Sequence, residues 1–102
     1  MINVGLYYRV KEGHEREFEE IFKKVLSALQ SSNAGFIGGK LYREVGDSRE
    51  YLIYTEWKDL ESFKNFVASR LFSEVTEYGK SIIEGMPRHK ILREETESIN
   101  PQ

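Results

Sequence analysis

Residues 36–57 read FIGGKLYREVGDSREYLIYTEW, two runs rich in β-branched and aromatic residues around a short Gly/Asp/Ser segment. Such runs favour strands, and a short loop of this composition between them is typical of an antiparallel hairpin. We therefore predict strands at 36–45 and 50–57, joined by a loop over Gly46–Arg49. Gly38 and Gly39 lack the spacing of a phosphate-binding loop and indicate a bulge or a close backbone approach.

The residues before the hairpin predict a strand followed by a helix. Side chains alternate along residues 2–10, which is the period of a strand, and Val4, Leu6, Tyr8 and Val10 share one face. Residues 14–30 instead place apolar side chains at helical spacing and so predict an amphipathic helix. The segment Asn33–Gly35 tolerates positive φ and favours a helix stop there.

The residues after the hairpin repeat this plan. Asp59 is a predicted N-cap, and the apolar stripe behind it changes phase near residues 68–70, which predicts two helical pieces with a bend. Gly85–Pro87 is expected to end the helical region, and residues 88–93 are expected to form a last short strand.

The order strand–helix–strand–strand–helix–strand predicts an α+β fold, the ferredoxin-like βαββαβ plan with a four-stranded antiparallel sheet. We expect one domain over residues 1–94 and a polar C-terminal tail over residues 95–102. Helices cover only one face of such a sheet. Tyr7, with Tyr54 or Trp57 depending on the hairpin register, would lie on the other face, so we predict a homodimer joined through its sheets.

Composition excludes several classes of function. The net charge of −2 comes from 17 acidic and 15 basic residues without a basic stripe, so no nucleic-acid partner is expected. No apolar run approaches the roughly 20 residues that span a bilayer, and the N-terminus lacks a signal-peptide pattern, so we expect no membrane association and a cytoplasmic location. The absence of cysteine excludes disulfides and thiolate chemistry.

The two histidines and one carboxylate in a predicted strand are candidates for metal ligands or catalytic groups. His14 opens the first predicted helix and His89 starts the last predicted strand, and neither has a metal-ligand spacing, so we expect no metal site. Glu56 lies beside Trp57 in a predicted strand. It is interpreted either as a buried catalytic base or, as we favour, as one half of a cross-strand ion pair with Arg9, with Arg43 or with the partner subunit.

Several strings in the chain carry a resemblance to a known family. They are Val10–Gly13 with Phe18 and Phe22, Gly35-Phe36, Leu41–Arg43, Tyr51–Trp57, and Leu60–Phe63 with Phe72. Together they resemble the antibiotic biosynthesis monooxygenase (ABM) superfamily of dimeric α+β barrels, to about Glu94. That superfamily is similar to quinone-forming oxygenases, heme-degrading oxygenases, isomerases and proteins without known chemistry. The resemblance implies a pocket between the helices and the inner sheet face of each subunit.

The resemblance also implies positions for functional groups. The heme-degrading branch would place an asparagine on the first strand, a tryptophan on the second helix and a heme-ligand histidine after the bend. This chain has Leu6, Phe66 and Thr76 there, and a threonine does not replace an imidazole ligand. Other branches commonly have a histidine at the second-helix position, and Phe66 lacks its proton-transfer group.

These observations predict a ligand-binding pocket lined by Leu6, Tyr8, Phe66, Thr76 and Tyr78. Tyr8 and Tyr78 are the catalytic candidates, because a phenol in an apolar pocket can donate a hydrogen bond to a substrate oxygen. The alternative interpretation is that both are structural residues, whose rings pack in the core or an interface and whose hydroxyls find a hydrogen-bond partner.

The resemblance implies a monooxygenase or isomerase acting on a small hydrophobic or aromatic molecule. The substrate would supply the electrons, so no cofactor is expected. A non-catalytic small-molecule-binding or dimerisation module is the alternative, and a heme-binding or heme-degrading protein is disfavoured.

Overall fold

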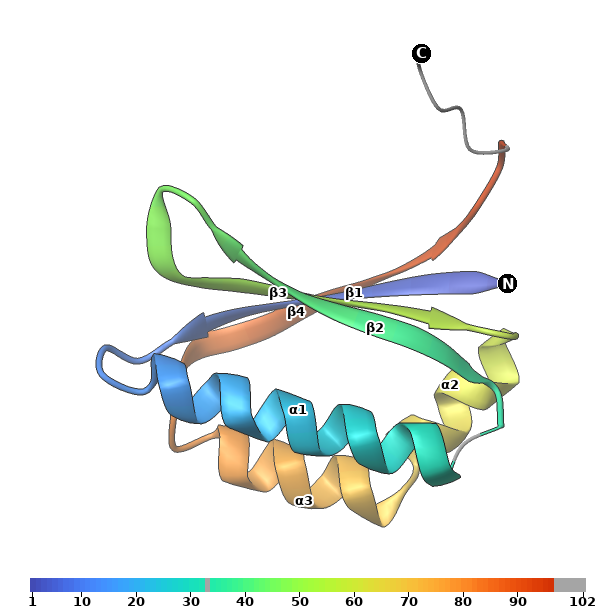
Figure 1. Ribbon diagram of the computed structural model, residues 1–102, viewed down its shortest axis with the longest axis horizontal. Coiled ribbons are helices and arrows are strands. Elements are labelled where there is room, and N and C mark those ends of the chain that lie inside the picture. Colours follow the sequence, from blue (N-terminus) through green and yellow to red (C-terminus); the bar gives the residue numbers. More distant parts are fainter. Residues whose placement is uncertain (33, 97–102) are drawn as a thin grey trace.

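The computed structural model describes residues 1–32 and 34–96, which form an α+β fold with the helices on one face of an antiparallel sheet (Figure 1). The elements are β1 (Ile2–Val10), α1 (Glu15–Ser32), β2 (Phe36–Glu44), β3 (Asp47–Trp57), α2 (Leu60–Val67), α3 (Arg70–Gly79) and β4 (Ile83–Arg93). The strands lie in the order β2-β3-β1-β4, and this confirms the predicted ferredoxin-like plan. None of the described helices is both long and apolar enough to cross a membrane.

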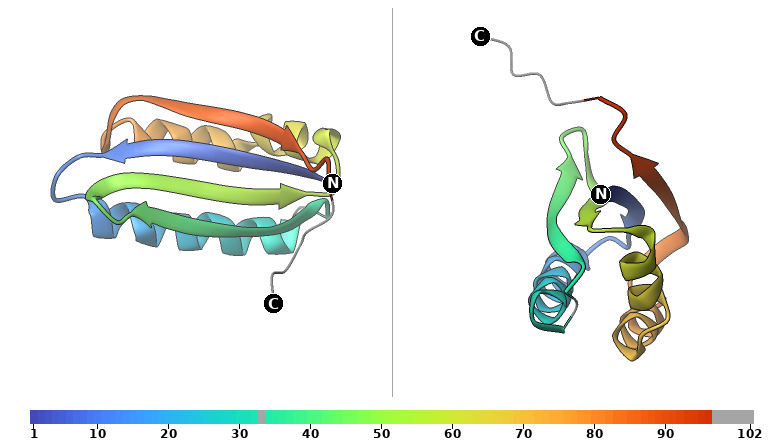
Figure 2. Two further views of the ribbon diagram at one scale, coloured as in Figure 1. Left: turned by 90° about the horizontal axis from the view of Figure 1, so that it is seen from above. Right: turned by 90° about the vertical axis from the view of Figure 1, so that its right-hand side faces the viewer.

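The helices lie below the two sides of the sheet rather than across its middle. Viewed end-on, α1 runs below the β2 side, while α2 and α3 run below the β4 side (Figure 2). Asp59 caps α2 by accepting a hydrogen bond from the Ser62 backbone N–H, and the Ser69 hydroxyl accepts one from the Phe72 N–H at the start of α3. These caps confirm the predicted break between two helical pieces.

The register of β1 against β3 sorts the side chains into two faces. Leu6 pairs with Ile53 and Tyr8 with Tyr51, and these residues face the helices. The alternate residues form the opposite face, called the outer face below. It includes Asn3, Tyr7, Arg9, Tyr42, Leu52, Tyr54, Glu56 and Leu92. Tyr54 therefore shares the face of Tyr7, whereas Trp57 lies on the helix side.

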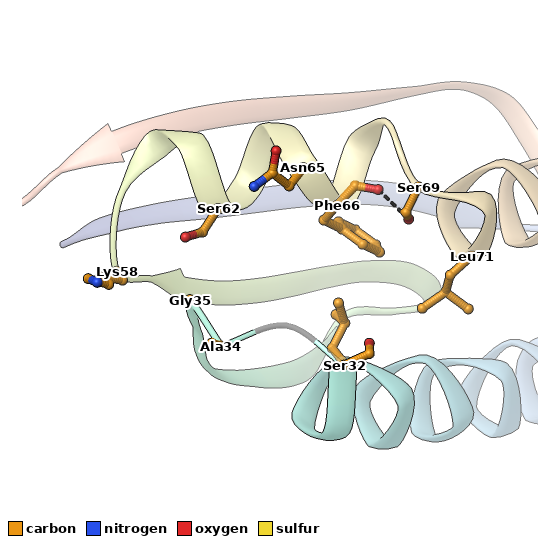
Figure 3. Close-up of a pocket in the computed structure, with 10 residues that line it drawn as sticks. Ser32, Ala34, Gly35, Lys58, Ser62, Asn65, Phe66, Ser69 and Leu71 are labelled. Carbon is orange, nitrogen blue, oxygen red and sulfur yellow. Dashed lines mark hydrogen bonds between the residues drawn. The ribbon is translucent and has the colours of Figure 1, made fainter.

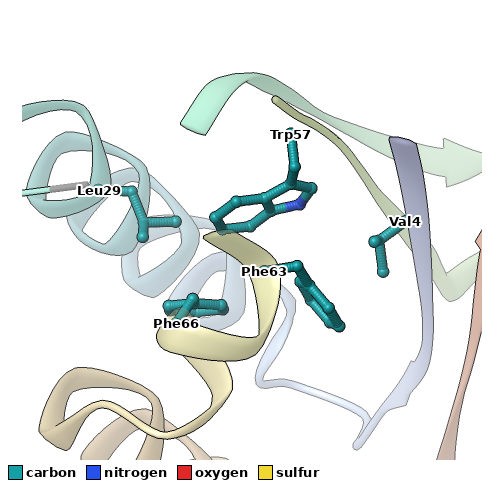
Figure 4. Packing of buried hydrophobic residues seen from close by; sticks show 5 residues of the cluster. All are labelled: Val4, Leu29, Trp57, Phe63 and Phe66. Atoms are coloured by element: carbon teal, nitrogen blue, oxygen red, sulfur yellow. The ribbon is translucent and has the colours of Figure 1, made fainter. Parts of the chain in front are cut away.

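Trp57 is the centre of the larger core cluster (Figure 4). Its side chain is only 1% exposed, and its ring lies 5.4 Å from that of Phe63 and 5.5 Å from that of Phe66. The indole Nε1–H donates to the Thr55 hydroxyl over 2.8 Å, and that hydroxyl donates to the Val4 carbonyl over 3.1 Å. The polar end of the indole is therefore satisfied inside the core.

The hairpin is tighter than predicted. Glu44 pairs with Asp47, so the turn consists of Val45 and Gly46 alone, and the expected loop over Gly46–Arg49 is wrong. The charged residues that suggested a loop instead extend β3. Arg49 donates to the Glu84 carboxylate of β4 over 3.0 Å, so ion pairing across strands keeps these polar residues in the sheet.

The last strand is longer than predicted. Gly85–Pro87 does not end the helical region but lies within β4, at a register shift between the partners of Tyr7 and Arg9. Gly85 has a φ of 74°, a left-handed conformation that favours glycine, and a bulge also tolerates the missing N–H of proline. Turn residues in the sequence therefore marked a bulge rather than a strand boundary.

Other local predictions have mixed outcomes. The Gly38-Gly39 interpretation is confirmed: the register shifts between Phe36 and Gly38, and a Cβ on Gly39 would lie 3.2 Å from the Leu26 side chain. The first helix ends at Ser32, beside the predicted stop, and Asn33 of that stop lies outside the described residues. Of the predicted tail, residues 97–102 also lie outside the described residues.

Candidate functional site

A cavity of about 400 Å³ lies between the helices and the helix-facing side of the sheet. We call it the central cavity, and its size is in the range of small-molecule pockets. Seven aromatic residues line it: Tyr8, Phe18, Phe22, Phe36, Trp57, Phe66 and Phe72. Aliphatic side chains make up most of the remaining lining, and most of its residues come from α1, α3 and β4. A site of this character favours an apolar or aromatic ligand.

The periodicity of β1 and of α1 directs their apolar side chains toward the cavity and so forms two of its walls. Alternation along β1 turns Leu6 and Tyr8 toward the helices, and the helical stripe of α1 presents Phe18, Phe22 and Leu26 to the same space. Phe66 reaches the cavity from α2, where it is 7% exposed and packs edge-on against Phe72 at 5.2 Å between ring centroids.

Tyr8 supplies a polar group in the apolar wall. Its ring packs against Phe18 at 5.5 Å, and burial raises the pKa of its hydroxyl, so the phenol stays protonated at neutral pH. The hydroxyl forms no hydrogen bond with any residue that the structure describes. It is a neutral donor beside the cavity that has no assigned acceptor within the described fold.

Tyr78 lies elsewhere. It is 48% exposed, is not among the residues that line the central cavity, and its hydroxyl donates to Glu17 of α1. The Glu17 carboxylate also contacts His14 Nδ1 at 2.8 Å, and the Tyr78 and His14 hydrogen bonds lower the pKa of Glu17. The structure thus brings Leu6, Tyr8, Phe66 and Thr76 together around the cavity and leaves Tyr78 outside, as a link between α3 and α1.

The rim of the central cavity includes three residues that the sequence did not single out as a group: Lys80, Arg88 and His89. His89 pairs with Leu6 across β1 and β4 and so lies on the helix side of the sheet, whereas Arg88 pairs with Tyr7 and so lies at an outer-face position. Their common location depends on the length of β4 and on its bulge, both of which periodicity misplaced. His14, which bonds to Glu17 at the start of α1, does not line this cavity.

Glu56 pairs with neither Arg9 nor Arg43, and a pair with the partner subunit stays a prediction. Glu56 lies on the outer face, while Arg9 binds Asp47 and Glu50 over 3.0 and 2.5 Å, and Arg43 binds Glu19. Within residues 1–32 and 34–96, no group of three or more His, Cys, Asp or Glu residues is placed to hold a metal ion.

Residues 1–78 match the family model described as antibiotic biosynthesis monooxygenase, ABM. The chain belongs to the ABM family. Among solved structures, a conserved protein from Methanosarcina mazei superposes with a TM-score of 0.84 at 22% identity, covering 92% of both chains. SnoaB, described as a cofactor-independent oxygenase from Streptomyces nogalater, superposes with a TM-score of 0.81 at 20% identity and 94% coverage of both chains. At these identities the likeness shows a shared ABM fold.

Sequence relatives of this ABM chain include a much longer protein. A protein of Natronomonas pharaonis, described as a candidate heme-binding protein, is 30% identical over 89 residues, which cover 87% of this chain. The ABM chain spans only 13% to 18% of the length of the first four curated relatives it matches. Their names describe whole proteins, most of which lies outside the matched part.

The cavity does not fit heme in the way the heme-degrading branch implies. The position expected to provide an imidazole holds Thr76, an exposed residue of α3 whose hydroxyl does not bind iron as histidine does. His89 is the single imidazole in the cavity lining, and it comes from the exposed strand β4. The ABM fold therefore retains its pocket here without that branch's ligand arrangement.

A second pocket, of about 420 Å³, lies where the C-terminal end of α1 approaches α2 (Figure 3). It shares Leu29 and Phe66 with the central cavity, so these two side chains separate the two spaces. Two of its hydroxyls already serve the helix ends, because Ser69 Oγ donates to the Phe66 carbonyl and Ser32 Oγ to the Ala28 carbonyl, each over 2.6 Å. The central cavity is the better candidate site.

Proposed function

We propose that this ABM-family chain binds a small hydrophobic or aromatic molecule in the central cavity and oxidises it without a cofactor. The observation that carries the proposal is the Tyr8 hydroxyl, a protonated donor in an aromatic wall that has no acceptor among the described residues. The description of the fold neighbour SnoaB as a cofactor-independent oxygenase supports the class of reaction. Transfer of that activity to this chain is our proposal.

The chemistry assigned to the protein is binding, orientation and charge stabilisation. The aromatic walls would hold the ring and exclude water, and Tyr8 would donate to the substrate oxygen on which negative charge develops as a carbon acid loses its proton. The substrate then gives its electrons to O₂. In a balanced reaction of this type, a CH₂ carbon becomes a carbonyl carbon, one oxygen atom enters the product and the other leaves as water.

Anthrone provides a direct test, because it is a small aromatic CH₂ ketone that O₂ converts to anthraquinone and water. We expect the protein to accelerate quinone formation and O₂ uptake above the rate in buffer. Tyr8→Phe should lower kcat by about 100-fold, the usual effect of removing one positioned donor, with a smaller change in KM.

Tyr78→Phe is the matched control, because it removes the same hydroxyl from a tyrosine outside the cavity lining. We expect it to leave anthrone turnover within about twofold. Equal losses in the two variants, or full activity of Tyr8→Phe, would exclude Tyr8 as the donor. Saturable binding of anthrone without any acceleration would favour the alternative of a non-catalytic binding module, because the cavity would be real and the reaction absent.

A heme-binding function is the second candidate, and the description of the Natronomonas pharaonis relative is what favours it. Titration with hemin distinguishes the two functions. We expect no saturable Soret shift, since Thr76 replaces the expected imidazole ligand. A stoichiometric shift that disappears in His89→Ala but persists in His14→Ala would identify a heme site at the rim and replace our proposal.

We also propose that a second copy of the chain covers the outer face. Tyr42 and Leu92 are 48% and 49% exposed there, beside Tyr7, Leu52 and Tyr54. The Asn3 side-chain oxygen on this face is buried without a hydrogen-bond partner among the described residues, so a partner chain could provide its donor.

Light scattering tests this assembly. We expect a dimer for the native chain and a shift toward monomer for Leu52→Glu, because a charge would be buried at the centre of the interface. Val67→Glu, a change of comparable size on the exposed surface of α2, should leave the dimer intact. A monomeric native chain would contradict the proposal.

A further inference from the structure

The reaction proposed for the central cavity needs a proton acceptor, and the Tyr8 hydroxyl does not provide one. Oxidation of an aromatic CH₂ ketone by O₂ begins when the carbon acid loses a proton, and a positioned base accelerates that loss. Burial raises the pKa of the Tyr8 hydroxyl, so this phenol keeps its own proton at neutral pH and serves as a donor. A different group is therefore required to act on the carbon.

Elimination leaves one candidate base in the described lining of the cavity. That lining contains no aspartate or glutamate, and its ionisable side chains besides Tyr8 are those of Lys80, Arg88 and His89. Arginine does not give up its proton in proteins, and Arg88 lies at an outer-face position. Lys80 Nζ is engaged with Glu77 over 3.1 Å, and an ammonium group has no lone pair to accept a proton. The imidazole of His89 remains.

His89 is available for this role. It pairs with Leu6 across β1 and β4, which places it on the helix side of the sheet and in the cavity lining. Its ring forms no ion pair or hydrogen bond with a described residue, and a neutral imidazole has one nitrogen that accepts a proton. The residue is also exposed, so a proton taken from a ligand can pass on to water.

His89 and Tyr8 lie where two groups can serve one ligand from different positions. Tyr8 is two residues beyond Leu6 on the same face of β1, so His89, which lies beside Leu6, is its diagonal neighbour on that face. Diagonal neighbours on a sheet face are about 7–8 Å apart, within reach of long side chains. In anthrone the acidic CH₂ and the carbonyl oxygen lie on opposite sides of the middle ring. A base for the carbon and a donor for the oxygen are thus two separate groups.

We infer that His89 is the general base of the oxidation proposed for the central cavity. Its imidazole nitrogen takes the proton as a C–H bond of the substrate CH₂ breaks, and the electron pair of that bond moves toward the carbonyl oxygen, to which Tyr8 donates. The imidazolium gives its proton to water, and the resulting enolate transfers its electrons to O₂. This inference rests on the proposed function, because it assigns one step of the same reaction.

Hydrogen exchange without O₂ isolates the proton transfer. In anaerobic D₂O, the native protein should accelerate the loss of the CH₂ signal of anthrone from the proton NMR spectrum. His89→Ala should slow this exchange and aerobic quinone formation each by about 100-fold, the lower end of what a positioned base contributes. Circular dichroism should show that this variant keeps the native fold.

His14→Ala is the matched control. It removes the other histidine of the chain, which bonds to Glu17 and does not line the cavity. We expect both rates to stay within about twofold of those of the native protein, because His14 has no place in the proton transfer.

Added imidazole distinguishes a missing base from a damaged structure. In His89→Ala, free imidazole should restore part of both rates beyond its effect without protein, because it supplies the lost proton acceptor. Tyr8→Phe should gain no such rescue, since that variant lacks the donor and retains the base.

The outcomes separate this inference from the proposed function. If the native protein oxidises anthrone and His89→Ala does so equally well, the function stands and His89 is not the base. A loss in His89→Ala that imidazole does not restore would assign the residue a structural role and also overturn the inference. If the native protein accelerates neither exchange nor quinone formation, the proposed function itself fails.

Discussion

The hydrogen-bond chain from Trp57 through Thr55 to Val4 predicts a large effect from a small substitution. Thr55→Val preserves the shape of the side chain and replaces its hydroxyl with a methyl group. Thr55 is 5% exposed and Trp57 is 1% exposed, so water does not replace the lost partner. The indole Nε1–H, which donates to the hydroxyl over 2.8 Å, would remain buried without an acceptor.

The magnitude follows from that unsatisfied donor. Leaving a buried donor without its partner costs about 1–3 kcal/mol, and burying the added methyl group offsets at most about 0.8 kcal/mol. We expect the free energy of unfolding to fall by about 2 kcal/mol. For a domain of this size, that corresponds to a melting temperature lower by about 10 °C.

Denaturant unfolding at fixed protein concentration measures this effect, and a double-mutant cycle assigns it. In the Trp57→Phe background there is no indole N–H, so Thr55→Val should cost about 1 kcal/mol less than in the native chain. Thr76→Val is the control, because the Thr76 hydroxyl has no partner among the described residues. It should change stability by less than about 0.5 kcal/mol.

Two results would refute this reasoning. One is a Thr55→Val protein as stable as the Thr76→Val control, which would mean that the indole needs no acceptor. The other is strict additivity in the cycle, which would place the cost of Thr55→Val somewhere other than the indole contact. Either result would remove the argument that hydrogen bonding fixes Trp57 as a rigid wall of the central cavity.

Three further predictions concern backbone strain and titration. Gly85→Ala should lower the free energy of unfolding by about 1–2 kcal/mol, because Gly85 has a φ of 74°, whereas Gly38→Ala, with open space and no positive φ, should change it by less than about 0.5 kcal/mol. The Tyr51 hydroxyl and Arg43 hold the pKa of Glu19 below its ordinary 4.5. The stability that ionised Glu19 contributes is therefore complete above that value and is lost as pH falls. Denaturant unfolding from about pH 6 to pH 3 should show a smaller fall in the free energy of unfolding for Glu19→Gln than for the native chain. Burial, with the Glu19 contact, raises the pKa of Tyr51 to about 12. The stability that the protonated Tyr51 hydroxyl contributes is therefore present below the ordinary tyrosine pKa of 10 and is lost as pH rises through about 12. Alkaline difference absorbance should show one late-titrating phenol fewer in Tyr51→Phe, and an unchanged curve would contradict the assignment.

The sequence predicted the fold well because its evidence is periodic. Alternation in residues 2–10 and the helical stripe of α1 each depend on local geometry, and the change of phase near Ser69 located the helix break. The failures occur where pairing between distant strands outweighs local composition. Gly46–Arg49 has the composition of a loop, yet Arg49 is retained in the sheet by Glu84, which lies 35 residues away in the chain.

The sequence and its family resemblance predicted four of the residues around the central cavity. Leu6, Phe66 and Thr76 follow from alignment to the family, and Tyr8 follows from strand alternation because it shares the face of Leu6. The structure places all four around one cavity. Tyr78 could not be placed in the same way, because its direction depends on the rotation of α3, and its hydroxyl is directed to Glu17 instead. The place of His89 on the helix side required the register of β4, which no local pattern contains.

The bulge in β4 places the left-handed Gly85 in the wall of the central cavity. Strand β4 packs mainly against β1, and apart from Ile83 its residues are exposed, although α2 and α3 run below this side of the sheet. The left-handed Gly85 lies opposite Tyr8, and both line the cavity. A regular strand would be more favourable locally, yet it would shift every residue after Gly85 relative to β1 and move His89 from its place opposite Leu6. The bulge therefore sets the position of His89 relative to Tyr8, so Gly85→Ala should weaken anthrone binding in the central cavity as well as lower stability.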